Sequence, residues 1–242
     1  MSSQSPYYLF YSLDNCILNN VPSNPYLGLE ISHDLKWHSH VNNITSKASR
    51  TLGFLQRNLQ HCTKDCRRTA YLSLVRSTLE YGSIIWDSHY KCDIDKLERI
   101  QNRAARFIKK DYHSKDPGCM TNMLKELELP SLQERRKQLR LIFMFKVVEG
   151  LVPAMPSDQL FKPRNTNKRH IKTRKFENCV SNNLVERSAT NNSKPYVVPR
   201  SFTDQFRNSF FVRTVNDWNQ LEEDCVTSTT IEQFKKRISL RD

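Results

Sequence analysis

Glycine is scarce in this chain of 242 residues, with only five glycines, at positions 28, 53, 82, 118 and 150. They are too widely spaced to form the Gly-rich loop that cradles a phosphate, and no Gly-x-Ser-x-Gly motif occurs. Adjacent aspartates, a common cue for a two-metal polymerase site, are also missing. The sequence therefore lacks the usual signatures of a nucleotide-binding or hydrolytic enzyme, and we expect no catalytic residues in it.

Long hydrophobic runs are missing as well. The most apolar stretch, residues 139–151, is too short to span a bilayer and contains Arg140, Lys146 and Glu149. The N-terminal residues lack the basic segment and the apolar segment of a signal peptide. The seven cysteines are odd in number and scattered, which is typical of reduced thiols. We expect an intracellular protein of the nucleus or cytoplasm, not secreted and with no membrane partner.

The histidines and cysteines do not form a recognisable metal site. Two groups lie close together in the sequence, but neither is followed by a second pair at zinc-finger spacing. They are His61, Cys62 and Cys66 in one group and His33, His38 and His40 in the other. We expect no metal and no other cofactor to bind this chain.

Positive charge, in contrast, is abundant: 38 Lys and Arg against 25 Asp and Glu give a formal net charge of +13. Such an excess favours a polyanionic partner, first of all a nucleic acid. The charge is concentrated on a predicted helix that ends near residue 110, with no acid between Glu98 and Asp111. One side of its helical wheel is apolar, and about 120° away lies a line of cations. The candidate nucleic-acid contacts are Arg99, Arg103, Arg106, Lys109 and Lys110. The alternative is an ordinary solvated helix face.

A second basic cluster lies at residues 162–175, where no acid occurs. Its irregular spacing suits a flexible electrostatic arm or a nuclear targeting signal, with a plain solvated loop as the alternative. From this cluster we add Lys172 and Arg174 to the candidate nucleic-acid contacts.

Hydrophobic periodicity predicts a mainly α fold, a helical bundle preceded by a small β-hairpin. We expect a hairpin that turns at Asp14-Asn15 and a further strand over 26–32, with Gly28 as a bulge or a close backbone approach. Helices are predicted over about 39–60, from Thr63 to 79, 93–110, 121–129, 131–149, 201–221 and 230–240. Capping residues are expected at Thr63, at Ser131 with Glu134, and at Thr229 with Glu232. Four segments follow: residues 1–35, a helical domain over 36–150, an irregular basic connection over 151–200, and C-terminal helices over 201–242.

Several stretches of the chain also resemble a known family. They are "YLGLEIS", "DLKWHSHVNNITSKASRTLGFLQRNL", "AYLSLVRSTLEYGSIIWD", "DIDKLERIQNRAARFI", "LELPSLQERRKQLRL" and "SFFVRTVNDWNQL". In this order they resemble the C-terminal part of reverse transcriptases from non-LTR retrotransposons, the jockey and chicken-repeat groups of LINE elements, over about residues 20–240.

This resemblance implies a role for each segment. Tyr26, Leu27 and Gly28 look like the last palm motif, the hairpin that grips the primer end. Residues 36–150 would be the helical thumb, which packs against an RNA–DNA or RNA duplex, with the arginines of the basic helix as backbone contacts. The parent polymerase would use Mg²⁺, but the palm aspartates that hold it have no counterpart here. The implied partners are a duplex and the catalytic part of a longer reverse transcriptase.

Two other functions remain open from the sequence. The chain could be a non-functional truncated relic of a retroelement, which would be expected to aggregate through open strand edges. It could also be a helical protein-interaction module, with Phe206, Phe210, Phe211 and Trp218 as its partner-binding patch. We expect Trp37, Trp86 and Trp218 to be core residues.

Overall fold

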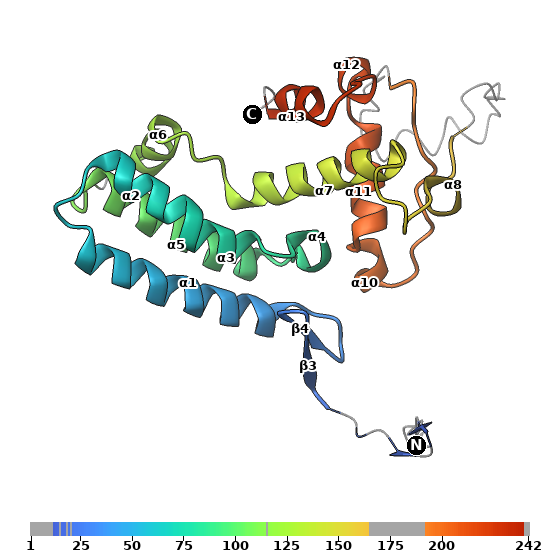
Figure 1. Ribbon diagram of the computed structural model, residues 1–242, viewed down its shortest axis with the longest axis horizontal. Coiled ribbons are helices and arrows are strands. Elements are labelled where there is room, and N and C mark those ends of the chain that lie inside the picture. Colours follow the sequence, from blue (N-terminus) through green and yellow to red (C-terminus); the bar gives the residue numbers. More distant parts are fainter. Residues whose placement is uncertain are drawn as a thin grey trace, which may run out of the picture.

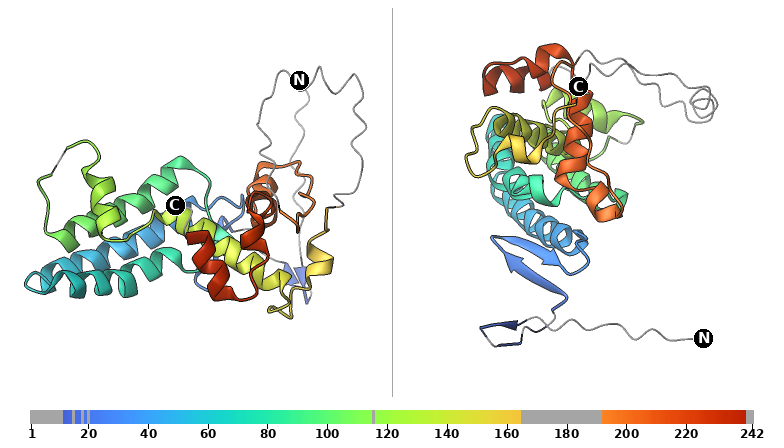
Figure 2. Two further views of the ribbon diagram at one scale, coloured as in Figure 1. Left: turned by 90° about the horizontal axis from the view of Figure 1, so that it is seen from above. Right: turned by 90° about the vertical axis from the view of Figure 1, so that its right-hand side faces the viewer.

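The structure is a computed structural model that describes residues 12–14, 16–17, 19, 21–114, 116–164 and 192–239. These residues are mainly helical, and two small antiparallel hairpins precede the helices (Figure 1). The hairpins project from the helical body on one side, as Figure 2 also shows. A mainly α fold with a small β element at its N-terminal end is confirmed.

The first hairpin pairs β1 (Ser12–Leu13) with β2 (Cys16–Ile17) across the expected turn. The single strand expected over 26–32 is wrong, because β3 (Ser23–Tyr26) turns at Leu27-Gly28 and pairs with β4 (Leu29–Ser32). Both turn residues have positive φ, 47° and 80°, the combination of a type I′ turn whose twist matches that of paired strands. Gly28 is also a close backbone approach, since a Cβ atom there would lie 3.3 Å from the Tyr81 ring.

The first core is built mainly on two long helices, α1 (His38–Asn58) and α5 (Lys91–Lys109). Between them α2 (Lys64–Ala70) continues through a π-helical segment, η1 (Tyr71–Arg76), into α3 (Ser77–Glu80). Two shorter helices complete it, α4 (Ser83–Trp86) and α6 (Cys119–Glu126). Its buried residues are Leu29, Val41, Ala48, Leu52, Leu55, Tyr71, Val75, Leu79, Trp86, Leu97, Ile100, Ala104, Ala105, Phe107, Ile108, Met123, Leu127, Leu129 and Leu132. The spacing of three and four residues that predicted these helices is the spacing that buries their apolar faces.

The second core gathers the C-terminal half around α7 (Leu132–Val148). The other helices are short: α8 (Ser157–Leu160), α10 (Asp204–Arg207), α11 (Phe210–Asn219), α12 (Glu223–Val226) and α13 (Ile231–Ser239). The buried residues are Leu141, Met144, Phe145, Val147, Phe161, Val215, Trp218, Leu221, Cys225, Val226, Phe234 and Ile238. A single helix over 201–221 was wrong, because the chain breaks at Asn208-Ser209 between α10 and α11.

The capping predictions hold at two of three helices. Thr63 accepts a hydrogen bond from the Cys66 backbone N–H, and Ser131 accepts one from the Glu134 N–H. At α13 the prediction was displaced by one residue. Thr230, not Thr229, accepts from the backbone N–H three residues on, that of Gln233. The Gln233 side chain accepts in return from Thr229, so the cap uses an amide where we expected a carboxylate.

Helix α7 belongs to both cores. Its first residue packs in the first core, while Leu141, Met144, Phe145 and Val147 pack in the second. Figure 2 shows it running from the bundle of the first core to the C-terminal helices. The boundary expected at residue 150 therefore does not coincide with the division between the cores. Among the described helices, none is both long and apolar enough to cross a membrane.

Two of the three tryptophans are fully buried, Trp86 in the first core and Trp218 in the second. Trp37 is half-buried and packs against the first core. The prediction that all three are core residues is therefore confirmed for Trp86 and Trp218, and Trp37 lies at the edge of the core. The burial of Trp218 also corrects the proposed patch of four aromatic residues, because a core side chain is not open to a partner.

Candidate nucleic-acid interface

The five basic residues predicted on α5 do not form a continuous exposed line. Arg99 and Lys110 are exposed, but the other three make contacts within the protein. Arg103 donates to Ser49 of α1, through Nη1 to Oγ at 3.0 Å and through Nη2 to the carbonyl oxygen at 2.8 Å. These two bonds fasten α5 to α1.

The remaining two residues hold the end of α5 in place. Arg106 Nη1 donates to the carbonyl oxygen of Ser114 at 3.0 Å, which fixes the loop after the helix. Lys109 pairs with Glu126 of α6. The wheel of a single helix gives the direction of a side chain but not the element that packs beside it, so these contacts could not be predicted from α5 alone.

A basic groove does exist, but it lies between α1 and α5 and uses cations from both helices. We call it the α1–α5 groove; its volume is about 380 Å³. Its lining residues are Thr45, Ser46, Ser49, Arg50, Lys96, Arg99 and Ile100. The lining thus combines three cations with three hydroxyl groups and includes no carboxylate.

The cations of the groove are held in different ways. Lys96 Nζ donates to Asn42 Oδ1 at 2.7 Å and lies 3.8 Å from the Asp93 carboxylate, so the lysine is partly positioned by the protein. Arg50 and Arg99 are exposed and make no hydrogen bond or ion pair with any part of the chain that the structure describes. Two guanidinium groups are therefore available to an external anion.

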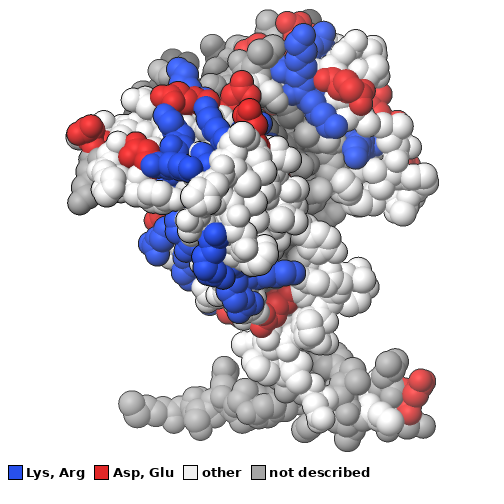
Figure 3. All heavy atoms as spheres, turned by 60° about the vertical axis from the view of Figure 1, so that its left-hand side comes forward, with Lys and Arg blue, Asp and Glu red and all other residues white. Residues whose placement is uncertain are grey.

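The sequence contained a signal for this second wall. No Asp or Glu occurs from residue 35 to residue 64, a stretch that covers the whole of α1. That helix carries Lys47, Arg50 and Arg57, all exposed. Figure 3 shows a group of Lys and Arg side chains in the lower half of the helical body, with acidic atoms only at its margins. Arg50 was not among the predicted contacts because it lies on α1, and the wheel of α5 does not include it. Lys96 lies on α5 but precedes Glu98, after which the acid-free run begins.

Tyr26, Leu27 and Gly28 lie at the tip of the β3–β4 hairpin. The side chains of Tyr26 and Leu27 are 64% and 73% exposed, and the Tyr81 hydroxyl donates to the Leu27 carbonyl oxygen at 3.1 Å. A hollow of about 530 Å³ beside this hairpin is lined by Gly28 and by Lys47 of α1. The exposed turn and the basic side of α1 are therefore neighbours.

Glu30 fastens the hairpin to α1. Its carboxylate accepts hydrogen bonds from Ser39 at 2.7 Å and from Ser23 at 3.0 Å, and Asn43 also donates to it. The bonds from Ser39 and Ser23 lower the pKa of Glu30. Beside it, burial lowers the pKa of His40, whose Nδ1 accepts from the Glu30 backbone N–H.

One group of possible metal ligands occurs among the described residues: His38, Cys92 and Asp93, whose ligand atoms lie within 4.8 Å of one another. The Asp93 carboxylate is buried, accepts from Ser88 at 2.8 Å and lies 2.7 Å from His38 Nδ1. It also lies in the first turn of α5, where the helix dipole favours an anion and opposes a bound cation. We interpret this group as a hydrogen-bonded contact between His38 and Asp93 that joins α1 and α5.

The basic cluster at 162–175 lies mostly outside the described residues, and Lys172 and Arg174 are among those outside. Arg164 is described, and its backbone N–H donates to the Pro195 carbonyl oxygen at 2.8 Å. Comparisons with protein-family models, with curated proteins and with solved structures found no match for this chain.

Proposed function

We propose that this chain is the nucleic-acid-binding part of a LINE-type RNA-directed DNA polymerase, which holds a template–primer duplex and has no catalytic residues of its own. The observation that carries the proposal is the α1–α5 groove, where Arg50, Lys96 and Arg99 converge with no carboxylate in the lining. The family assignment rests on the sequence resemblance alone.

The chemistry of the groove fits a phosphate backbone. Guanidinium groups form paired, charge-assisted hydrogen bonds with phosphate oxygens, and Arg50 and Arg99 have their donors available. The hydroxyl groups of Thr45, Ser46 and Ser49 can bind phosphate oxygens or ribose 2′-hydroxyls. Contacts of this kind recognise the shape of an A-form duplex and carry little sequence information.

The position of the hairpin supports the same proposal. Its exposed turn at Leu27-Gly28 and the groove both adjoin α1, with Lys47 beside the hairpin and Arg50 in the groove. A duplex along α1 could therefore meet both features, with its backbone in the groove and one end near the turn.

The test is binding of a labelled RNA–DNA hybrid over a series of salt concentrations. We expect the double variant Arg50→Glu with Arg99→Glu to weaken binding by at least about tenfold and to reduce the salt slope by about 2, since each phosphate contact contributes about one unit. Reversal of Arg103 or Arg106 is unsuitable, because their guanidinium groups bind backbone carbonyls.

The matched control is Lys235→Glu with Lys236→Glu on α13, two exposed lysines in the second half of the molecule. This variant changes the net charge by the same amount as the double variant of Arg50 and Arg99, but it should leave the salt slope of hybrid binding unchanged. Equal losses in the two double variants would show that only net charge matters, and the groove would not be the interface. Absence of hybrid binding by the unmodified chain would reject the proposed function altogether.

A further inference from the structure

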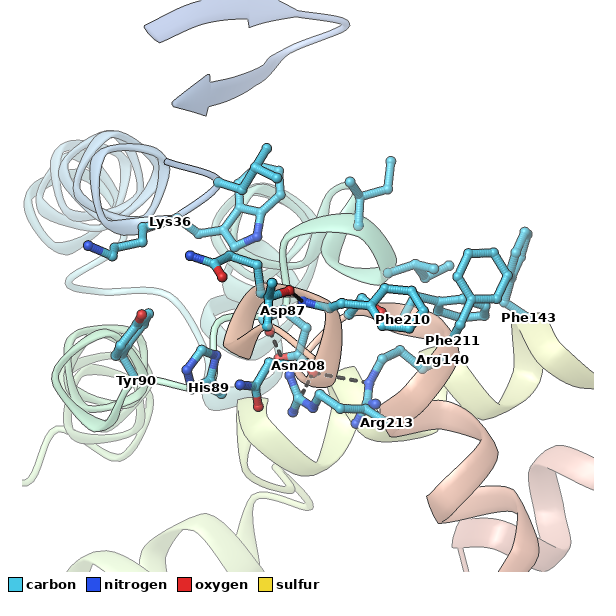
Figure 4. Close-up of a pocket in the computed structure, with 18 of the residues that line it drawn as sticks. Lys36, Asp87, His89, Tyr90, Arg140, Phe143, Asn208, Phe210, Phe211 and Arg213 are labelled. Atoms are coloured by element: carbon cyan, nitrogen blue, oxygen red, sulfur yellow. Dashed lines mark hydrogen bonds and ion pairs between the residues drawn. The ribbon is translucent and has the colours of Figure 1, made fainter. Parts of the chain in front are cut away.

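A third hollow, largely apolar, lies between the two cores and shares no lining residue with the α1–α5 groove. We call it the inter-core groove; its volume is about 650 Å³ (Figure 4). One wall comes from the segment before α1 and from α4, and the other from α7, α10 and α11. Its main apolar lining residues are Trp37, Ile84, Ile85, Phe143, Phe206 and Phe210.

One part of the groove is strongly polar and is organised around Asp87. The carboxylate of Asp87 is buried and pairs with three arginines, two from α7 and one from α11. The contacts join Oδ1 to Arg136 Nε at 2.8 Å, Oδ2 to Arg140 Nε at 3.0 Å, and Oδ2 to Arg213 Nη2 at 3.1 Å. Figure 4 shows Arg140 and Arg213 converging on Asp87 beside His89 and Asn208.

The positive charge at this place is not fully compensated. The residues that line the groove include Lys36, Arg140 and Arg213 but only one carboxylate, that of Asp87. Because Lys36 pairs with Asp34 at 3.3 Å, the excess of positive charge lies at the arginines. Arg140 also binds Asp217 at 3.0 Å, yet within the described part of the chain its buried Nη1 has no hydrogen-bond partner. A buried guanidinium donor without a partner is costly, so an anion in this position would be favoured.

The protonation states of Arg213 and His89 determine the charge beside Asp87. Burial lowers the pKa of Arg213, while Asp87 opposes the shift, and a guanidinium group remains charged in either case. Burial and the neighbouring Arg213 lower the pKa of His89. At neutral pH His89 is therefore uncharged and supplies an N–H donor.

We propose that the inter-core groove binds a small amphipathic anion, an alkyl or aromatic body that ends in a carboxylate. The apolar walls would bury the body, and Arg140 and Arg213 would bind the carboxylate, for which a guanidinium group is the best-matched partner. The volume lies in the range of small-molecule sites, which combine mostly apolar walls with a few convergent polar groups. Such a ligand would contact both cores and stabilise them against separation.

The test compares three probes with the same apolar body and different head groups: decanoate, decanol and decyltrimethylammonium. Each is titrated against the full chain carrying the dye anilinonaphthalene sulfonate, itself an aromatic body with an anionic group. Decanoate should displace the dye at a concentration at least about tenfold lower than decanol does. The reason is that hydrogen bonds to charged groups increase affinity by about that factor or more. Decyltrimethylammonium should be the weakest of the three.

A pair of exposed residues locates the site. Ile85 lines the groove and is 62% exposed, so Ile85→Glu should fold and should weaken decanoate binding by at least about tenfold. Leu74 is 51% exposed and does not line the groove, and Leu74→Glu should leave decanoate binding unchanged. Equal displacement by decanol and decanoate, or equal effects of the two variants, would overturn the proposal. Hybrid binding should be unaffected by Ile85→Glu, so the two proposals fail or stand separately.

Discussion

Arg67 in the first core and Arg136 and Arg140 at the junction of the two cores are all buried, but different partners stabilise them. Arg67 donates to the Ile108 carbonyl oxygen at 3.1 and 2.7 Å and to the Cys62 carbonyl oxygen at 2.6 Å. The Ile108 carbonyl lies at the end of α5, where the helix dipole favours a cation, and the Cys62 carbonyl lies in the turn before α2.

The junction arginines instead depend on charges brought from other elements. Arg136 and Arg140 share the single carboxylate of Asp87, and Arg140 also binds Asp217 of α11. Arg67 therefore binds backbone carbonyls that all lie within the first core. The ion pairs of the junction form only when the residue after α4 meets α7 and α11, so the second half of the molecule is positioned by charge as well as by apolar packing.

The largest loss of stability is expected for Asp87→Asn, which keeps the shape of the side chain and removes its charge. Arg136, Arg140 and Arg213 would then lose the carboxylate that they share, and only the ion pair between Arg140 and Asp217 would remain of the four in this cluster. We expect the free energy of unfolding to fall by about 3–5 kcal/mol, the usual cost of leaving a buried charge unpaired. Denaturant unfolding would measure the loss. A change below about 1 kcal/mol would mean that the arginines do not depend on Asp87.

The corresponding test in the first core is Arg67→Met, which keeps much of the apolar stem and removes the guanidinium group. Because the Ile108 and Cys62 carbonyls lie near helix ends and can bind water instead, the loss should be smaller, about 1–3 kcal/mol. The measurement is the same unfolding experiment, run beside Asp87→Asn. A larger loss for Arg67→Met than for Asp87→Asn would reverse the comparison.

The first core could be predicted from the sequence more fully than the second, of which only α7, α13 and the burial of Trp218 were predicted, and the packing explains why. Val41, Ala48, Leu52 and Leu55 recur at helical spacing over a helix of 21 residues, long enough for a clear period. Apart from α7, the second core depends on helices of four to ten residues and on loop contacts. One example is the Asn192 side chain, which donates to the Trp218 carbonyl oxygen at 2.7 Å. Contacts between residues so far apart in the chain leave no local pattern.

The candidate sites also differ in how far the sequence of a single helix could predict them. Arg99 could be identified from the wheel of one helix, and its exposure agrees with that prediction. Arg103 has nearly the same position on the wheel, but α1 packs beside it and Ser49 takes its donors. The inter-core groove requires residues from Leu35 to Arg213 to come together, which no single helix wheel can indicate.

The smallest expected effect concerns the edge of the first core, where Glu30 holds the β3–β4 hairpin on α1. Hydrogen bonds from Ser39 and Ser23 lower the pKa of Glu30 in the folded protein, so the folded state favours the ionised carboxylate. The stabilisation is therefore complete above the ordinary pKa of a glutamate and is lost as the pH falls through the lowered value. Hydrogen exchange of the β4 amides should accordingly become faster, relative to the amides of α5, as the pH is lowered through this range.

Glu30→Gln should expose these amides at neutral pH and remove the extra acid dependence, whereas Glu232→Gln, at an exposed position on α13, should change neither. If the β4 amides of Glu30→Gln kept the protection and acid response of the unmodified chain, the hairpin would be held by Leu29 packing in the first core and not by the Glu30 carboxylate.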